Sequence, residues 1–160
     1  MLLNPGNPAN PAVFKHVAAS APALGVAAVA VNATTPQAIA AAFADAAQQG
    51  AGAVIVAADA FFSGQGPQIA AAAAQNRLAT ISLYRDHARA GALISYGQNV
   101  AEFHRQAARY VDRILKGAKP EDLPVEQPTK FDLVINGKTA ATLGLSIPQE
   151  LLVFADEVIE

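Results

Sequence analysis

Three polar side chains stand where an open parallel sheet would bind a ligand. Asp59 follows the most hydrophobic run of the chain, residues 53–57, while Asn4 and Asn7 follow a short apolar run at residues 1–3. Ligands of such sheets bind outside the carboxyl ends of the strands. A carboxylate there can pair with an ammonium group or accept a hydrogen bond from a hydroxyl. The alternatives are a helix cap or turn for Asp59 and an ordinary strand-to-helix turn for the asparagines, and the sequence favours neither reading.

Aromatic side chains follow the same predicted strands. Phe61 and Phe62 come directly after Asp59, and adjacent aromatics in a loop are costly to leave in water. They predict an apolar wall of the site, a plug at the end of the sheet or a contact with another chain, with at least one of them in the core. Tyr84 and Arg85 follow another short strand, where a phenol can stack on a ligand and a guanidinium can hold a carboxylate. Arg85 with Asp86 is alternatively a surface pair.

Catalytic and metal chemistry have little support in the residue pattern. The three histidines (His16, His87, His104) are scattered, without the spacing of a metal site or a catalytic triad, and there is no cysteine. His87 is expected in a loop facing the ligand edge. The glycines at 64 and 66 match neither common nucleotide-binding pattern. We therefore expect no catalytic residue, no metal, no cofactor and no enzyme activity.

Composition excludes further classes of protein. The 160 residues fit one domain, and 52% hydrophobic residues with 15% charged residues indicate a packed core. A formal net charge of -2 without a Lys/Arg cluster argues against a nucleic-acid partner. The alanine-rich runs are too interrupted for a membrane span, and the N-terminus does not resemble a signal peptide.

The order of elements predicts an α/β fold. Short apolar runs at residues 1–3, 26–31, 53–57, 79–81 and 93–95 alternate with alanine-rich helical stretches, a pattern typical of a mostly parallel sheet. Asn10-Pro11 and Thr35-Pro36 predict two helix starts. Residues 84–91 are expected to be a polar loop. Asn99 caps a long helix to residue 116, residues 118–129 form a proline-rich connector, and residues 131–135 form the last strand.

An ordered series of motifs resembles the ABC-transporter substrate-binding proteins that include aromatic amino-acid binders. The motifs cover nearly the whole chain: Asn4-Pro5-Gly6-Asn7-Pro8, Asp59-Ala60-Phe61-Phe62, residues 90–97 (AGALISYG), residues 114–120 (ILKGAKP), residues 123–131 (LPVEQPTKF) and residues 136–145 (NGKTAATLGL). The resemblance implies a periplasmic-binding-protein type I fold, a Rossmann-like three-layer α/β/α lobe, and candidate ligand contacts at Asn4, Asn7, Asp59, Phe61, Phe62, Tyr84 and Tyr96. Ala60 replaces an asparagine that amino-acid binders of the family often carry.

The resemblance also implies a domain organisation. The family has two lobes that close on a ligand, and residues 1–160 correspond to the C-terminal lobe alone, with the helix at 99–116 belonging by analogy to the other lobe. The apolar stripe of that helix, Phe103, Val111, Ile114 and Leu115, would then lack its usual partner. An exposed stripe of this kind is an interaction site. It predicts a homodimer in which the helix packs on a second chain.

Two functions follow from these expectations. The first is the solute-binding component of an ABC transporter, which binds an amino acid or a small aromatic or apolar acid between two lobes and presents it to a permease. The alternative is a single lobe acting as a dimeric interaction or sensor domain without transport. The family resemblance implies a periplasmic location, whereas the chain as given, without a signal peptide, would remain cytoplasmic.

Overall fold

The computed structural model describes residues 1–127 and 130–160, and it confirms an α/β fold with a mostly parallel sheet. Five strands form a sheet in the order β3-β4-β5-β6-β7, β1 and β2 form a parallel pair, and a parallel bridge between Leu2 and Val56 joins the two groups. β6 pairs antiparallel with β5 and parallel with β7, so β6 and β7 run opposite to β3, β4 and β5. The strands are β1 Leu2–Leu3, β2 Val31–Asn32, β3 Ala53–Ile55, β4 Ala79–Ser82, β5 Ile94–Gln98, β6 Phe131–Asn136 and β7 Glu157–Ile159.

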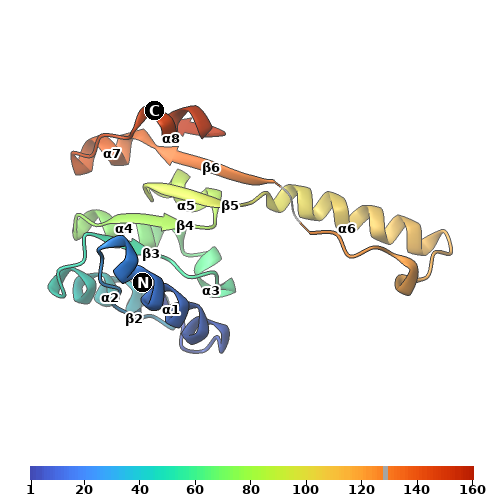
Figure 1. Cartoon of the computed structure of the whole chain (residues 1–160), viewed down its shortest axis with the longest axis horizontal. Coiled ribbons are helices and arrows are strands. Elements are labelled where there is room, and N and C mark those ends of the chain that lie inside the picture. Colours follow the sequence, from blue (N-terminus) through green and yellow to red (C-terminus); the bar gives the residue numbers. More distant parts are fainter. Residues whose placement is uncertain (128–129) are drawn as a thin grey trace.

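Helices alternate with the strands and cover the sheet, as the three-layer prediction requires (Figure 1). Helix α4 packs beside both α2 and α5. The helices are α1 Ala9–Ser20, α2 Pro36–Gln48, α3 Ala60–Ser63, α4 Gly66–Gln75, α5 Arg85–Ala90, α6 Val100–Leu115, α7 Gly137–Leu143 and α8 Gln149–Phe154, with short 3-10 helices at Ala21–Leu24 and Pro120–Asp122.

The core lies between the first strands and the alanine-rich helices. Thr35 caps α2 through a hydrogen bond from the N–H of Ala38 to Oγ1 (3.3 Å), as its Thr-Pro sequence predicts. Small alanine side chains let α2 and α4 approach each other and the sheet closely. The core residues are Leu2, Val31, Ala33, Ile39, Ala42, Phe43, Ala46, Val54, Val56, Phe62, Ile69, Ala72, Ala73 and Leu78.

Several predicted boundaries are wrong for physical reasons. The strand expected at residues 26–31 is reduced to Val31–Asn32, because its partner β1 comprises only Leu2 and Leu3. The strand expected at 93–95 extends to Gln98, since β6 pairs with it as far as the Gln98–Phe131 register. The final segment contains α8 and a seventh strand, β7, which pairs with β6 and was not expected from its short, mixed sequence.

The polar loop expected at residues 84–91 is instead a short helix, α5. The turn before it is closed by the N–H of Tyr84, which donates to Oγ of Ser82 at 2.9 Å. His87 and Ala88 on this helix are fully buried, so the expectation of a loop histidine facing the ligand edge is also wrong. A helix of six residues is too short for the apolar periodicity that identifies longer helices.

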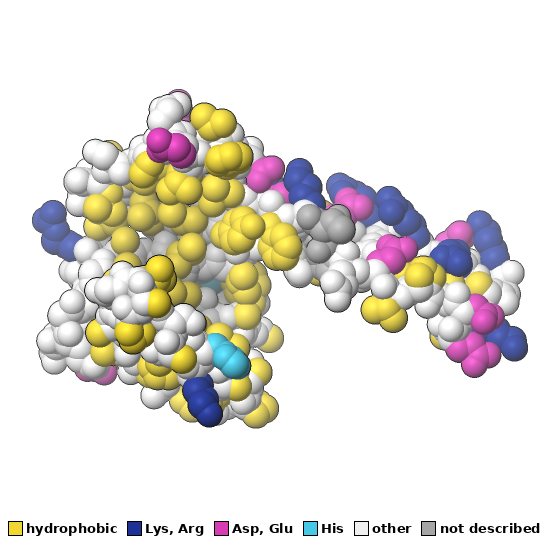
Figure 2. All heavy atoms as spheres, viewed as in Figure 1, with side chains coloured by type: hydrophobic (Ala, Val, Ile, Leu, Met, Phe, Trp, Pro, Cys, Tyr) yellow, Lys and Arg dark blue, Asp and Glu magenta, His cyan; other side chains and the backbone are white. Residues whose placement is uncertain are grey.

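Helix α6 extends away from the body of the molecule together with the segment that follows it (Figure 1). Asn99 caps it as predicted, accepting a hydrogen bond from the N–H of Glu102 at 3.2 Å. None of its residues is buried, and charged side chains gather along this arm (Figure 2). The expected connector at residues 118–129 includes two residues, 128 and 129, that lie outside the described part of the chain.

Within the described residues, no helix has both the length and the apolar character needed to cross a membrane.

Candidate functional site

The carboxylate of Asp59 binds the side chains of both predicted asparagines. Nδ2 of Asn4 donates to Oδ1 of Asp59 at 3.0 Å, and Nδ2 of Asn7 donates to Oδ2 at 2.7 Å. Asp59 follows β3 and the asparagines follow β1, and the Leu2–Val56 bridge brings these strand ends together. Asn4, Asn7 and Asp59, here called the Asp59 cluster, therefore lie together at the carboxyl edge of the sheet, where the sequence places them.

Asp59 also starts helix α3. Its Oδ1 accepts a hydrogen bond of 2.9 Å from the N–H of Phe61, so the helix-cap reading of this residue is confirmed. Burial alone would raise the pKa of this carboxyl, but hydrogen bonds from Asn4, Asn7 and the N–H groups of Phe61 and Phe62 outweigh burial and lower the pKa. The cluster therefore holds a buried negative charge at neutral pH.

The loop that carries the two asparagines is held by their own side-chain oxygens. Oδ1 of Asn4 accepts from the N–H of Gly6 and Oδ1 of Asn7 accepts from the N–H of Ala9, both at 3.0 Å. These are Asx turns, which fix the side chain relative to the backbone two residues on. The hydrogen bond to its oxygen thus fixes the orientation of each asparagine side chain, and its amide nitrogen points at Asp59.

Asn10 supports this loop from within the fold. The sequence did not predict this role, because an Asn-Pro pair is typical of a helix start. Asn10 lies inside the first turn of α1 and is 2% exposed. Its Oδ1 accepts from the N–H of Asn4 at 2.9 Å, and its Nδ2 lies 3.5 Å from the carbonyl oxygen of Ala58. Asn10 therefore links the backbones on the two sides of the Asp59 cluster.

Tyr84 joins the cluster through the main chain of Asp59. Its hydroxyl donates to the carbonyl oxygen of Asp59 at 3.0 Å and lies 3.3 Å from the N–H of the same residue. Tyr84 ends the turn between β4 and α5, so a third strand end contributes to the site. The phenol is half-buried and its hydroxyl is directed at the backbone.

The two phenylalanines separate into different environments. Phe62 is fully buried in the core, which confirms that at least one of the pair is a core residue. Phe61 is half-buried and packs against the core, with its ring centroid 5.1 Å from that of Phe62. Phe61 therefore leaves apolar surface near the Asp59 cluster, whereas Phe62 has none to offer a ligand in this conformation.

Tyr96 lies apart from the Asp59 cluster. It stacks on Phe131 with a centroid distance of 5.6 Å, and both rings are exposed. Successive residues of a strand point to opposite faces of the sheet, so Tyr96 points away from the face of Ser95 and Gly97. Its role as a ligand contact stays a prediction.

A cleft of about 620 Å³ opens beside Tyr84, between the ends of β4 and β5 and the start of α6. Ser95 and Gly97 lie along its wall with Tyr84, Arg85 and Asp132. Volumes of this size accommodate small organic ligands. The cleft adjoins the Asp59 cluster through Tyr84, which lines the cleft and donates a hydrogen bond to the main chain of Asp59.

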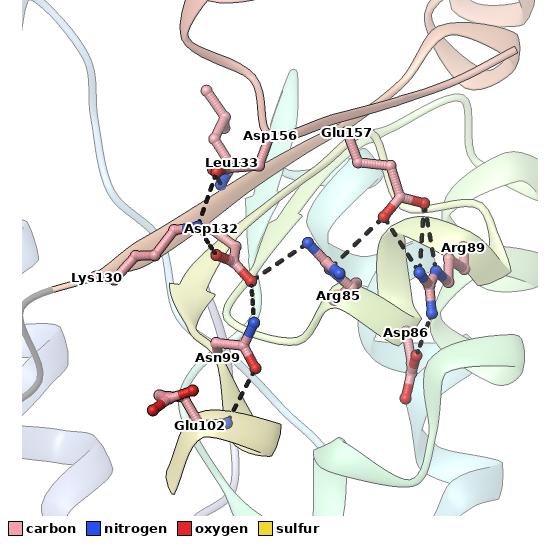
Figure 3. A network of polar contacts seen from close by, with 10 residues as sticks. All are labelled: Arg85, Asp86, Arg89, Asn99, Glu102, Lys130, Asp132, Leu133, Asp156 and Glu157. Atoms are coloured by element: carbon pink, nitrogen blue, oxygen red, sulfur yellow. Dashed lines mark hydrogen bonds and ion pairs between the residues drawn. The ribbon is translucent and has the colours of Figure 1, made fainter. Parts of the chain in front are cut away.

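Asp132 forms the centre of a polar network in this cleft (Figure 3). It is 6% exposed, accepts a hydrogen bond of 2.8 Å from Nδ2 of Asn99 and lies 3.3 Å from Nη2 of Arg85. Lys130 is also within ion-pair distance of Asp132, at 3.8 Å. We call Arg85, Asn99, Lys130 and Asp132 the Asp132 network.

The network changes the interpretation of Arg85. Its guanidinium contacts Asp132 and lies 3.7 Å from Glu157, whereas Asp86 pairs with Arg89 instead. The alternative of an Arg85–Asp86 surface pair is therefore wrong. Because Arg85 already faces carboxylates of the chain, its charge is largely compensated before any anionic ligand arrives. The pairing depends on β6 and β7, whose arrangement no local motif indicates.

Among the described residues, no group of three or more His, Cys, Asp or Glu side chains is arranged to hold a metal ion.

Comparisons with known proteins identify the family of the chain. The model of the family described as "ABC transporter substrate binding protein" matches residues 1–159, and the chain belongs to that family. A search of curated proteins gives no match. The family is one of substrate-binding proteins rather than of enzymes.

Solved structures of similar fold come from three bacteria. A conserved domain protein of Vibrio cholerae has a TM-score of 0.86 at 25% identity and covers 98% of this chain and 53% of its own. An ABC domain of Streptococcus pneumonia in complex with L-Trp has a TM-score of 0.86 at 22% identity, over 99% of this chain and 53% of its own. The ligand-free, open structure of a Clostridium difficile substrate-binding protein with adhesive properties has a TM-score of 0.69 at 18% identity. The match covers 99% of this chain and 52% of that chain.

The chain spans about half the length of the solved structures that it matches. This fraction is consistent with a single lobe, and the assignment of residues 1–160 to one lobe of two stays a prediction.

Proposed function

We propose that this chain is the lobe of a solute-binding protein that holds a small amine-bearing molecule at the Asp59 cluster and delivers it to an ABC permease. One observation carries the proposal. The loops after β1, β3 and β4, which are distant in sequence, converge through direct hydrogen bonds on one buried carboxylate residue. This arrangement lies at the sheet edge where open α/β folds bind ligands.

The unused hydrogen-bonding capacity of the cluster defines the kind of ligand. Each asparagine amide has two N–H groups and gives one to Asp59. Oδ1 of Asp59 accepts from Asn4 and from the N–H of Phe61, Oδ2 accepts from Asn7, and the N–H of Phe62 also acts on the carboxyl. The cluster thus retains a carboxylate acceptor flanked by amide donors. It suits a ligand that carries a cationic donor and an acceptor close together, such as an α-amino acid.

Phe61 extends this match to the rest of the ligand. Its half-buried ring offers apolar surface next to the cluster, which favours an amino acid with an aromatic or apolar side chain. The Streptococcus pneumonia structure in complex with L-Trp supports that choice. A small aromatic or apolar acid is the other member of the predicted ligand class, and it would present its carboxylate to the asparagine amides.

Transport requires binding and release without a chemical step. Closure of a second lobe over the ligand would create the surface that a permease recognises, and the ligand shifts the equilibrium only through its differential affinity for the closed state. The proposal therefore includes no enzyme activity and a periplasmic or extracellular location, both of which follow from the family.

Calorimetric titration tests the proposal with three probes: L-tryptophan, L-leucine and indole-3-propionate, which lacks the amine. We expect binding of L-tryptophan, at least tenfold weaker binding of indole-3-propionate, and loss of L-tryptophan binding in Asp59→Asn. Asp45→Asn, on the exposed face of α2, is the matched control and should bind as the wild type does. Equal affinity of wild type and Asp59→Asn for L-tryptophan would refute the proposal.

A second candidate function is a dimeric interaction module formed through α6. The observation that favours it is the exposure of the apolar stripe, since Phe103, Val111, Ile114 and Leu115 are 38–83% exposed. Light scattering at high concentration distinguishes the two. A dimer that Val111→Gln dissociates, and that Arg109→Gln on the opposite side of α6 does not, would favour the interaction module. A monomer would exclude it.

A further inference from the structure

The segment that presents the Asp59 carboxylate is short, and the carbonyl group of Phe62 near its end accepts several hydrogen bonds. Helix α3 spans only Ala60–Ser63, between the cap at Asp59 and Gly64. The carbonyl oxygen of Phe62 accepts from the N–H groups of Gly64 and Gln65, the latter at 2.9 Å. One turn of helix has little stability of its own, so its position depends on contacts from outside.

Two side chains from one neighbouring turn hold this segment at both ends. Tyr84 contacts the main chain of Asp59 at 3.0 Å, and Nε2 of His87 lies 2.9 Å from the carbonyl oxygen of Phe62. The contacting residues are three apart on each side, 84 with 87 and 59 with 62. We call these two contacts the Tyr84–His87 clamp.

The hydrogen bond to Phe62 determines the tautomer of His87. A carbonyl oxygen only accepts hydrogen bonds, so Nε2 must carry the proton. The other ring nitrogen, Nδ1, is buried and has no hydrogen-bond partner among the described residues. The ring therefore acts as a neutral donor at Nε2.

Packing keeps the ring of His87 in this orientation. The side chain is fully buried, and its Cδ2 atom would lie 3.1 Å from a Cβ atom placed on Gly66. On its other side the ring packs against Tyr84, with centroids 5.0 Å apart. The backbone of His87 is fixed as well, since the N–H of Ala92 donates to its carbonyl oxygen at 2.8 Å.

We propose that His87 is a positioning residue of the ligand site, whose Nε2–H group holds helix α3 so that the Asp59 carboxylate faces the asparagine amides. The proposal rests on the proposed function in taking Asp59 as the group that binds the ligand. His87 itself touches no ligand, because its side chain has no exposed surface. Its effect passes through Phe62 to the helix that Asp59 caps.

Two substitutions separate the hydrogen bond from the volume of the ring. His87→Gln places an amide N–H close to the position of Nε2, whereas the shorter side chain of His87→Asn cannot reach Phe62. Both variants bury an amide in place of an imidazole, so both lose thermal stability. A purely structural role predicts no difference between them at the ligand site.

Carbon-detected NMR of the Asp59 carboxyl gives the deciding measurement, without any ligand. In the wild type and in His87→Gln the carboxyl should titrate below its usual range, because the N–H groups of α3 remain in place. In His87→Asn it should titrate closer to the usual value of about 3.9. Identical Asp59 titrations in His87→Gln and His87→Asn would overturn the proposal.

Two further measurements cover the remaining cases. In the wild type, ring ¹⁵N shifts should show the proton of His87 on Nε2, and an Nδ1–H tautomer would overturn the proposal even if His87→Asn does not fold. With L-tryptophan as the probe, His87→Asn should bind at least fivefold more weakly than His87→Gln. Absence of binding in the wild type counts against the proposed function alone, because the Asp59 titration does not depend on the ligand.

Discussion

Nδ2 of Asn99 donates a hydrogen bond of 2.8 Å to Oδ2 of Asp132, 33 residues further along the chain. Asn99 is the cap of α6, where the chain leaves the body of the molecule, and Asp132 is the second residue of β6, where the chain returns. The register places Gly97 opposite Asp132 in the same antiparallel pair. The two segments that cross between the body of the molecule and α6 are thus joined beside the cleft, and substitutions can test this contact.

Removal of the Asp132 carboxylate should destabilise the fold. Asp132→Ala leaves Arg85 and Asn99 without their shared acceptor, at a cost of about 1–3 kcal/mol for hydrogen bonds that involve a charged group. The free energy of unfolding from urea denaturation measures this change. Glu121→Gln is the control, since the exposed Lys119–Glu121 pair contributes less than about 1 kcal/mol. Equal stability of the two variants would show that the network contributes nothing.

Gly97 permits a close approach between β5 and the turn that follows β4. A Cβ atom at this position would lie 2.1 Å from the carbonyl oxygen of Leu83, so Gly97→Ala must displace backbone. We expect a loss of about 1–3 kcal/mol, the usual range for overpacking. Gly64→Ala is the control, because its Cβ would meet nothing within 4 Å and its φ of -91° suits any residue. Similar unfolding midpoints would contradict so close an approach of the two backbones.

Asn10 should matter more for stability than its polar character suggests. Asn10→Ala removes the acceptor of the Asn4 N–H, and an unsatisfied buried donor costs about 1–3 kcal/mol. Gln68→Ala, on the exposed side of α4, should change stability by less than about 0.5 kcal/mol. Thermal unfolding of both variants measures the difference, and a neutral Asn10→Ala would show that the Asn4 loop does not depend on this contact.

His87 should make stability depend on pH in mildly acidic solution. Burial lowers its pKa, while backbone groups of Phe62 and Ser63 and the charge of Asp86 oppose this shift. The unfolded chain, with a histidine pKa of about 6.5, therefore binds protons that the folded chain does not. The stabilisation is complete above a pH of about 6.5 and is lost as pH falls below it. His87→Gln should have a flatter stability curve between about pH 7 and 5, and an unchanged slope would assign the effect to another group.

The sequence predicted those parts of the fold that depend on local pattern. The alternation of β-branched runs with alanine-rich stretches indicated the α/β class, and Thr35-Pro36 and Asn99 marked the starts of α2 and α6. The position of Asp59 after the most apolar strand, together with the asparagines after β1, predicted that these side chains meet at one edge of the sheet. These predictions succeed because strand ends of a parallel sheet meet at one edge.

Other parts of the site depend on tertiary contacts that carry no local signal. The Asn-Pro sequence of Asn10 predicts a helix cap. Its side chain is instead buried and contacts the backbones of Asn4 and Ala58. His87 was expected in a loop because α5 is too short to show a helical period. The partners of Arg85 come from β6 and β7. No sequence motif predicts where these two strands lie in the sheet or in which direction they run.

Binding of a ligand amine at the Asp59 cluster is tested most directly by a two-dimensional ¹⁵N spectrum of the labelled chain. The side-chain amide signals of Asn4 and Asn7 are followed during titration with L-tryptophan and with indole-3-propionate. We predict saturable shifts of both amides with L-tryptophan, at least tenfold weaker saturation with indole-3-propionate, and no shifts in Asp59→Asn. Shifts confined to other residues, or an equal response to both compounds, would contradict an amine site at this cluster.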